Sequence, residues 1–152
     1  MDAILRFDST LFLFLNHLPH NALFNTFGIG LSAIGTAGIV WLVLGGILFL
    51  REEKKDHLFF APILLSAATS WILIEKIIKP LIARVRPNEV MGAIIVGSGS
   101  DGFSFPSGHA TIAFAMAVVL SRKEPKWKWA FYTLAILISI SRIYLGKHYP
   151  LD

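Results

Sequence analysis

The sequence predicts an all-α polytopic membrane protein, a helical bundle that forms one domain over residues 1–152. Hydrophobic residues make up 55% of the chain and charged residues only 16%, whereas soluble domains average roughly 45–50% and about 25%. The mean hydropathy is +0.64. No Asp, Glu, Lys or Arg occurs between Ser9 and Leu50, a run longer than the roughly 20 residues that a membrane helix needs. We therefore expect much of the surface to face lipid.

The first 50 residues contain two predicted helices, which Pro19 and Asn21 separate. Residues 4–18 are too short and too charged to span a membrane, so we expect an amphipathic helix that lies in the membrane interface. Residues 23–50 form the first predicted span. Its glycines should let a neighbouring helix approach closely; they are Gly28, Gly30, Gly35, Gly38, Gly45 and Gly46.

The remaining predicted spans alternate with polar loops. The spans are residues 58–78, 107–120 and 129–145, and the loops are residues 51–56, 91–104 and 122–128. Trp127 and Trp129 are placed as an aromatic belt at the start of the last span. The prediction is therefore about four spans and an N-terminal interfacial helix.

The distribution of Lys and Arg predicts the orientation of this bundle. The loops at 51–57 and 121–128 hold seven of these cations, and the opposite side also holds seven. If Lys79, Arg86 and Arg142 are held in a binding site, the comparison becomes seven to four. Because positive loops stay inside, we expect the loops at 51–57 and 121–128 to be cytoplasmic. The other end should then face outward from the plasma membrane.

Composition also excludes several kinds of chemistry. The sequence contains no cysteine, so disulfides, thiolate metal sites, iron–sulfur clusters and thiol nucleophiles are ruled out. The net charge of +4 suits a nucleic-acid-binding protein or a basic membrane protein. With this hydropathy we expect membrane lipids as partners and no nucleic acid. The P-loop motif of nucleotide-binding enzymes is absent.

Three polar clusters lie at the ends of predicted spans that meet at the same membrane surface. Residues 79–87 end the second span with the sequence KPLIARVRP, and residues 105–109 open the third with FPSGH. Residues 141–152 close the fourth with SRIYLGKHYPLD. Because alternate ends of antiparallel helices lie together, these distant segments are predicted to form one pocket.

The second cluster has the features of an anion-binding helix start. Ser107 is a natural N-cap, and the first helical turn leaves N–H groups without intrahelical partners. Gly108 would let an anion come close to the backbone. The alternative is an ordinary capped helix on which His109 points toward the interface.

The cations of the first and third clusters extend this interpretation. A charge within an apolar membrane helix costs roughly 2.5–3.5 kcal/mol, so Arg142 should face a cavity or a polar partner. Taken singly, Lys79, Arg86 and Arg142 are each explained by snorkelling to the interface. Together with the helix start they predict a site for a multiply charged anion, most simply phosphate.

His148 and Asp152 add what phosphate hydrolysis requires. A neutral imidazole attacks phosphorus through one nitrogen, while a carboxylate on the other nitrogen fixes its tautomer. His109 could then protonate the leaving oxygen. The alternatives are an interfacial histidine, a helix-start carboxylate, or a metal site of two histidines and an aspartate. The nearby cations disfavour a metal, because they would repel it and already neutralise charge.

With these three clusters the sequence resembles the type 2 phosphatidic acid phosphatase (PAP2) family, whose lipid phosphatases share a core with vanadium haloperoxidases. The family pattern is K-x6-RP, then PSGH, then SR-x5-H-x3-D, and residues 79–152 match all three motifs in order. The resemblance implies that His148 is the nucleophile and forms a phosphohistidine, that Asp152 orients it, and that His109 is the general acid and then the base. It also implies a metal-free site without a cofactor, in which the phosphoryl oxygens contact Lys79, Arg86, Ser107, Gly108 and Arg142.

Family members continue into another membrane helix after the last motif, whereas this sequence ends at Asp152. We therefore expect a chain truncated at its C-terminus, without the helix that Pro150 would begin. The compact size is similar to that of bacterial undecaprenyl-diphosphate phosphatases. The expected activity is hydrolysis of a lipid phosphate or diphosphate.

Several functional alternatives remain at the level of sequence. Within the family, the enzyme could act on phosphatidate or phosphatidylglycerophosphate. A haloperoxidase is disfavoured because those relatives are soluble. A small anion transporter would explain the spans and Arg142 but not the His148–Asp152 pair, and a non-catalytic scaffold is a third class. The oligomeric state is not predicted.

Overall fold

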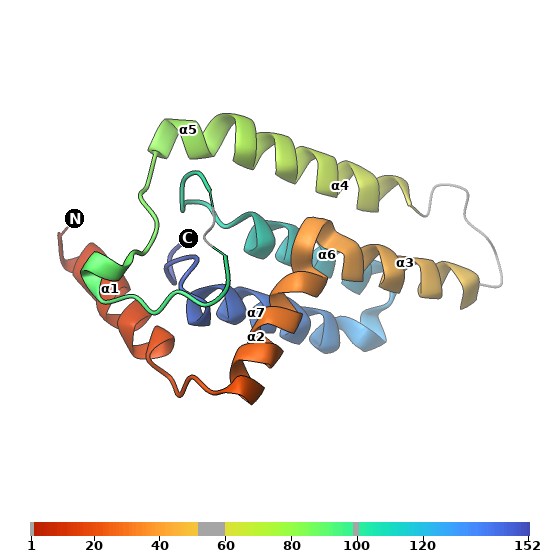
Figure 1. Ribbon diagram of the computed structural model, residues 1–152. Coiled ribbons are helices and arrows are strands. Elements are labelled where there is room, and N and C mark those ends of the chain that lie inside the picture. The colour runs from red at the N-terminus through yellow and green to blue at the C-terminus, as the bar shows by residue number, and fades with distance from the viewer. Residues whose placement is uncertain (1, 52–59, 99–100) are drawn as a thin grey trace.

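The computed structural model describes residues 2–51, 60–98 and 101–152, and within these ranges the prediction of an all-α protein is confirmed (Figure 1). The α-helices are α1 (Asp2–Asn16), α2 (Ala22–Gly35), α3 (Ile39–Arg51), α4 (Ala61–Ile72), α5 (Lys79–Ile82), α6 (Gly108–Lys123) and α7 (Lys128–Tyr144). A π-helical stretch, Leu73–Ile78, joins α4 to α5. Short 3-10 turns occupy Thr36–Gly38, Glu89–Met91 and Pro125–Trp127.

Each predicted span corresponds to helical structure, but the first is not a single helix. The helical segment Ala61–Ile82 has 22 residues and is long and apolar enough to cross a membrane. Residues 23–50 instead divide into α2 and α3, which meet at an angle of 64°. Gly38 in the connecting turn has a φ of +73°, which glycine adopts without strain. Helices α6 and α7 are shorter, with 16 and 17 residues.

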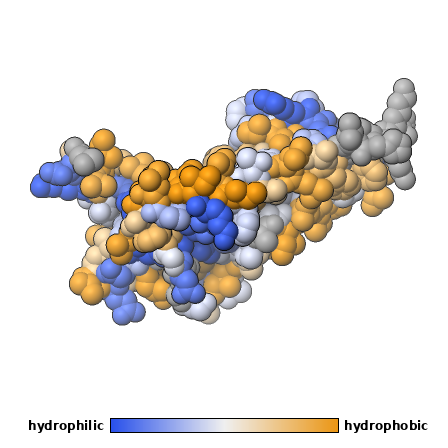
Figure 2. Space-filling model, turned by 90° about the horizontal axis from the view of Figure 1, so that it is seen from above, coloured by the Kyte–Doolittle hydropathy of each residue, from blue (hydrophilic) through white to orange (hydrophobic). Residues whose placement is uncertain are grey.

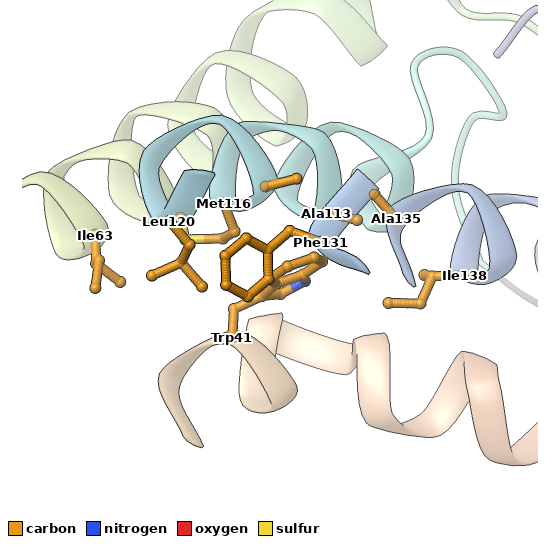
Figure 3. Close-up of a cluster of buried hydrophobic side chains, with 9 residues drawn as sticks. Trp41, Ile63, Ala113, Met116, Leu120, Phe131, Ala135 and Ile138 are labelled. Atoms are coloured by element: carbon orange, nitrogen blue, oxygen red, sulfur yellow. The ribbon is translucent and has the colours of Figure 1, made fainter. Parts of the chain in front are cut away.

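The core is small and lies between α3, α4, α6 and α7. Helix α6 packs against both α4 and α7, and its buried residues Ala113, Met116, Ala117 and Leu120 follow helical spacing. Figure 3 shows Met116 and Leu120 grouped with Trp41 of α3, Ile63 of α4 and Phe131 of α7. Apolar residues also cover much of the outer face seen in Figure 2. This pattern suits a protein whose surroundings are lipid.

The predicted close approach at glycines is confirmed at four of six positions. A Cβ on Gly28 would lie 3.0 Å from Tyr144, and one on Gly35 would lie 2.7 Å from Ile138. These contacts bring α2 against α7. Gly38 and Gly45 make similar contacts. Within the described part of the chain, no atom lies within 4 Å of a Cβ placed on Gly30 or Gly46, so the described residues show no close approach there.

Helix α1 directs part of its polar side into the protein. Asp8, Phe12 and Asn16 are four residues apart and fully buried, while Phe7 and Phe14 are more than 60% exposed. The Asn16 amide donates to the carbonyl oxygens of Ile94 and Tyr144, each at 2.9 Å, and accepts from the Ile94 amide at 2.7 Å. Asp8, one of the charges within the predicted interfacial helix, is therefore an internal group.

The three polar clusters lie at one end of the bundle. In Figure 1 the end of α7, the start of α6 and the segment after α5 share that end, together with α1. The turn between α6 and α7 lies at the opposite end, where α3 finishes and α4 begins. Of the predicted hydrophilic loop 51–56, only Arg51 is among the described residues.

Gly146 gives the first testable prediction, because the chain reverses there between α7 and His148. Its φ is +72°, and a Cβ would lie 2.5 Å from the carbonyl oxygen of Ile94. Replacing Gly146 with Ala should therefore destabilise the protein by at least about 1–2 kcal/mol, read as a lower unfolding temperature in detergent. Gly30→Ala is the matched control, since no atom of the described residues lies within 4 Å of a Cβ at that position. Equal effects of the two substitutions would contradict this account.

Candidate active site

The site is centred on His148, whose side chain is held at both ring nitrogens. Its Nδ1 lies 3.2 Å from Oδ2 of Asp152, and its Nε2 lies 3.1 Å from Nη1 of Arg86. A guanidinium can only donate, so Nε2 is the acceptor and Nδ1 carries the proton that is donated to Asp152. The residue is only 3% exposed. The lone pair of Nε2 therefore points toward the guanidinium of Arg86.

Asp152 is an acceptor-only group with several donors around it. Its Oδ2 accepts from the Ser104 hydroxyl and from the Tyr149 amide at 2.8 Å, and its Oδ1 accepts from Arg84 at 2.7 Å. Burial raises the pKa of Asp152, but the hydrogen bonds from His148, Ser104 and Tyr149 and the charge of Arg84 outweigh it and hold the pKa below 3.8. Asp152 is therefore ionised at neutral pH.

The same surroundings keep His148 neutral. Burial lowers its pKa below the ordinary 6.5, and the positive charges of Arg86 and Arg142 act in the same direction. The hydrogen bond to Asp152 opposes this change without cancelling it. A neutral imidazole beside an ionised carboxylate is the resting state that nucleophilic attack requires.

Arg86 joins the first cluster to the third. It lies in the non-helical segment after α5, where its Nη1 donates to the carbonyl oxygen of Lys147 at 2.7 Å and its Nε to that of Gly102 at 3.2 Å. The Lys147 ammonium in turn donates to the Ser98 carbonyl oxygen. These contacts fix the guanidinium next to His148.

The start of α6 lies against the same group of residues. Ser107 caps the helix as predicted, with its Oγ accepting from the Ala110 amide at 3.4 Å, and its own amide donates to the carbonyl oxygen of Asp152 at 2.8 Å. Gly108 and His109 line a cavity of about 220 Å³ that Glu75 also borders. The Nε2 of His109 lies 3.4 Å from Oγ1 of Thr36.

Lys79 and Arg142 have polar partners in this arrangement. The Lys79 ammonium is 2.5 Å from Oε1 of Glu75, one turn earlier in the chain. Arg142 donates to the Ser32 hydroxyl of α2 and lines a cavity of about 320 Å³, so it has both the cavity and the partner expected for a charge within a membrane helix. Lys79 also interacts electrostatically with His109, and Arg142 with Arg86.

All eight predicted site residues thus lie at one end of the bundle, and the structure links them through a few additional groups. Those that the sequence analysis missed are Asp8, Glu75, Arg84 and Ser104. Arg84 and Arg86 are two residues apart in the non-helical segment after α5, and both contact the His148–Asp152 pair, so the proximity of Arg84 to a motif arginine was a usable signal. Asp8 lies far away in the sequence and carried no such signal.

Metal-ligating side chains do not gather at this end. Throughout residues 2–51, 60–98 and 101–152, no group of three or more His, Asp or Glu side chains could hold a metal ion. The charges that face the imidazole of His148 are mainly those of Arg86, Arg142 and Asp152.

Comparison with known proteins gives consistent similarities. Residues 59–152 match the model of the PAP2 superfamily. The chain is 31% identical over 115 residues to an undecaprenyl-diphosphatase of Sulfolobus acidocaldarius, covering 74% of this chain but 54% of the relative. It is 31% identical over 160 residues to a lipid A 4'-phosphatase of Porphyromonas gingivalis, covering 100% of this chain and 67% of that protein. The chain thus spans about half to two-thirds of the length of these relatives.

A solved structure shares the fold. The crystal structure of a transmembrane PAP2-type phosphatidylglycerolphosphate phosphatase from Bacillus subtilis superimposes with a TM-score of 0.72 at 26% sequence identity. The match covers 100% of this chain and 78% of that one. The predicted polytopic membrane bundle is therefore confirmed as the fold class.

Proposed function

The chain belongs to the PAP2 superfamily, and from that premise we propose that it is a membrane phosphatase that hydrolyses a lipid phosphate or diphosphate. One observation carries the proposal: His148 has its Nδ1 on Asp152 and its Nε2 among cations. A phosphate anion that takes over the hydrogen bond of Arg86 would meet the electron pair that Nε2 then exposes.

The proposed reaction has two steps. The Nε2 of His148 attacks phosphorus, the bond to the leaving oxygen breaks, and the phosphoryl group is transferred to Nε2 as a phosphohistidine. His109 donates a proton to the leaving oxygen and then accepts one from the water that attacks the phosphohistidine. The second step releases inorganic phosphate and restores both histidines.

The remaining site residues would neutralise the phosphoryl group. Arg86, Arg142 and Lys79 supply positive charge, and the amide groups at the start of α6 near Ser107 and Gly108 supply donors. Arg86 would exchange its contact with Nε2 for a phosphoryl oxygen when substrate binds. Lys79 would likewise either break its ion pair with Glu75 or contact Glu75 and a phosphoryl oxygen at the same time.

The surroundings of the site support a lipid substrate. The protein is apolar around its sides, so a substrate with a hydrocarbon tail would reach the polar end from the bilayer. The relatives named above act on undecaprenyl diphosphate and lipid A. A polyprenyl diphosphate is our first candidate, followed by phosphatidate and phosphatidylglycerophosphate. We further propose that the site faces outward from the plasma membrane.

A substrate panel tests this proposal. The full-length protein in detergent should release inorganic phosphate from at least one lipid of the panel: farnesyl diphosphate, undecaprenyl diphosphate, phosphatidate and phosphatidylglycerophosphate. Movement of phosphate across liposomes without hydrolysis would instead support an anion transporter.

Chelation gives a separate prediction. Because the proposed site neutralises phosphate with Lys79, Arg86 and Arg142, dialysis against EDTA should leave the rate of phosphate release unchanged. The control is a metal-dependent phosphatase in the same buffer. A loss of activity that added Mg²⁺ restores would contradict the proposed metal-free reaction.

A further inference from the structure

Helix α1 contributes a buried carboxylate to the polar end of the bundle, although it lies outside the residues matched by the family model. Asp8 has no exposed surface. Its Oδ2 accepts from Nη2 of Arg84, and its Oδ1 accepts from the Leu151 amide at 2.9 Å. Leu151 immediately precedes Asp152 in the chain. Asp8 therefore contacts both the backbone beside Asp152 and a side chain that touches it.

Arg84 connects the two carboxylates. Its Nη2 donates to Asp8 and its Nη1 donates to Oδ1 of Asp152 at 2.7 Å. The guanidinium lies 4.0 Å from the centre of the Tyr149 ring, and the Arg84 carbonyl oxygen accepts from the Ser104 amide at 2.7 Å. The planar guanidinium imposes direction on the groups it joins. Because Arg84 occupies Oδ1, the Oδ2 of Asp152 is the oxygen that meets His148.

Asp8 also balances charge. Without it, the full positive charge of Arg84 would act on Asp152 and weaken the hold of that carboxylate on an imidazolium at His148. With it, Arg84 is shared between two buried anions, and each buried ion has a partner. The carboxylate of Asp152 is thus oriented without being neutralised.

We propose that Asp8 and Arg84 are positioning residues for the nucleophilic pair, so that the N-terminal helix is part of the catalytic apparatus and not only an anchor. This inference rests on the proposed phosphatase function. Figure 1 shows α1 lying across the end of the bundle near the C-terminus, which is the placement the proposal needs.

The docking of α1 does not depend on Asp8 alone. Asn16 bonds to Ile94 and Tyr144, and Phe12 packs against Tyr149 with ring centres 5.2 Å apart. Asp8→Asn should therefore leave α1 in place and change the charge beside Asp152. Asn16→Ala should instead loosen the packing of α1 without altering any charge.

The pH dependence of kcat/KM distinguishes a positioning role of Asp8 and Arg84 from a purely structural one. The charges that face His148 are those of Asp152, Arg86 and Arg142, and His109 of α6 interacts with it electrostatically. Removing the negative charge of Asp8 disfavours protonation of His148, so the acid limb of kcat/KM should move to lower pH in Asp8→Asn. Removing the positive charge in Arg84→Gln should move it to higher pH, and the double variant should lie between.

The test measures phosphate release by the protein in detergent from the lipid of the panel above that it hydrolyses fastest. Asp8→Asn and Arg84→Gln should each lower kcat by about 10- to 100-fold, as misplaced catalytic groups do, with KM nearly unchanged. Arg84→Lys should recover only part of this loss, because an ammonium keeps the charge but lacks the planar fork that directs separate N–H groups at the two carboxylates. Asp2→Asn, at the exposed start of α1, should match the unmodified protein. Asn16→Ala should lower the unfolding temperature without moving the acid limb.

Wild-type kcat in Asp8→Asn, or an acid limb that moves equally in Asn16→Ala, would overturn the inference. If the unmodified protein releases no phosphate from any lipid, the proposed function fails instead. The positioning role is then judged by NMR titration of histidine-labelled protein. Opposite shifts of the His148 pKa in Asp8→Asn and Arg84→Gln support it, and unmoved pKa values refute it.

Discussion

Replacing His148 with Ala should abolish phosphate release, with a fall in kcat of at least about 10⁴-fold, the scale of losing a nucleophile. The buried imidazole has its Nδ1 on Asp152 and its Nε2 beside Arg86. Among the described residues, no other histidine has a carboxylate on one ring nitrogen and an arginine on the other, and His109 lies against Thr36. Alanine therefore removes the attacking atom and leaves the cations in place.

The measurement is single-turnover phosphate release together with binding of inorganic phosphate. Binding should persist in His148→Ala because Arg86 and Arg142 remain. His17→Ala is the matched control, since His17 is exposed and bonds only to the Gly92 carbonyl oxygen among the contacts described. Retained turnover in His148→Ala would rule out the phosphohistidine route.

The second large effect is expected from Asp152→Asn, which should lower kcat by about 10³- to 10⁴-fold with little change in KM. The carboxylate accepts from His148, Ser104, Arg84 and the Tyr149 amide. An amide has only one acceptor oxygen, so its NH₂ group would face a donor. The imidazole would then lose the partner that fixes its tautomer, the change that is so costly in hydrolases with a histidine–aspartate pair.

Asp152→Asn is best followed by kcat, by the affinity for inorganic phosphate and by the NMR tautomer of His148. We expect a proton on Nδ1 in the unmodified protein and a mixed or reversed tautomer in the variant. The exposed Asp2→Asn serves as the matched substitution. An unchanged tautomer with full kcat would show that Asp152 is structural.

Much of the fold was predictable because it depends on local patterns. Apolar runs predicted the helices, and Ser107 predicted where α6 begins. The bend between α2 and α3 was not predicted. A glycine in an apolar run is compatible with either a straight helix or a turn, and the packing of Gly35 against α7 and of Gly38 against Ile112 accompanies the turn.

The candidate site was likewise predictable only in part. The motif residues were predicted, but the partners of Lys79 and Arg84 were not. Glu75 belongs to none of the three motifs, yet it is the residue that meets Lys79. The roles assigned to the motif residues and the outward orientation stay predictions.

The sequence by itself determined the class of protein and the chemistry available to it, because apolar runs, motif spacing and residue types are properties of short segments. Only the tertiary structure decided which charges meet. Asp8 is 76 residues from Arg84 and 144 from Asp152. No local sequence pattern encodes the hydrogen bonds by which Arg84 joins the two carboxylates. The burial of Asp8 against Arg84 arises because α1 packs across the end of α7. A buried ion is stable only where such packing supplies its partner.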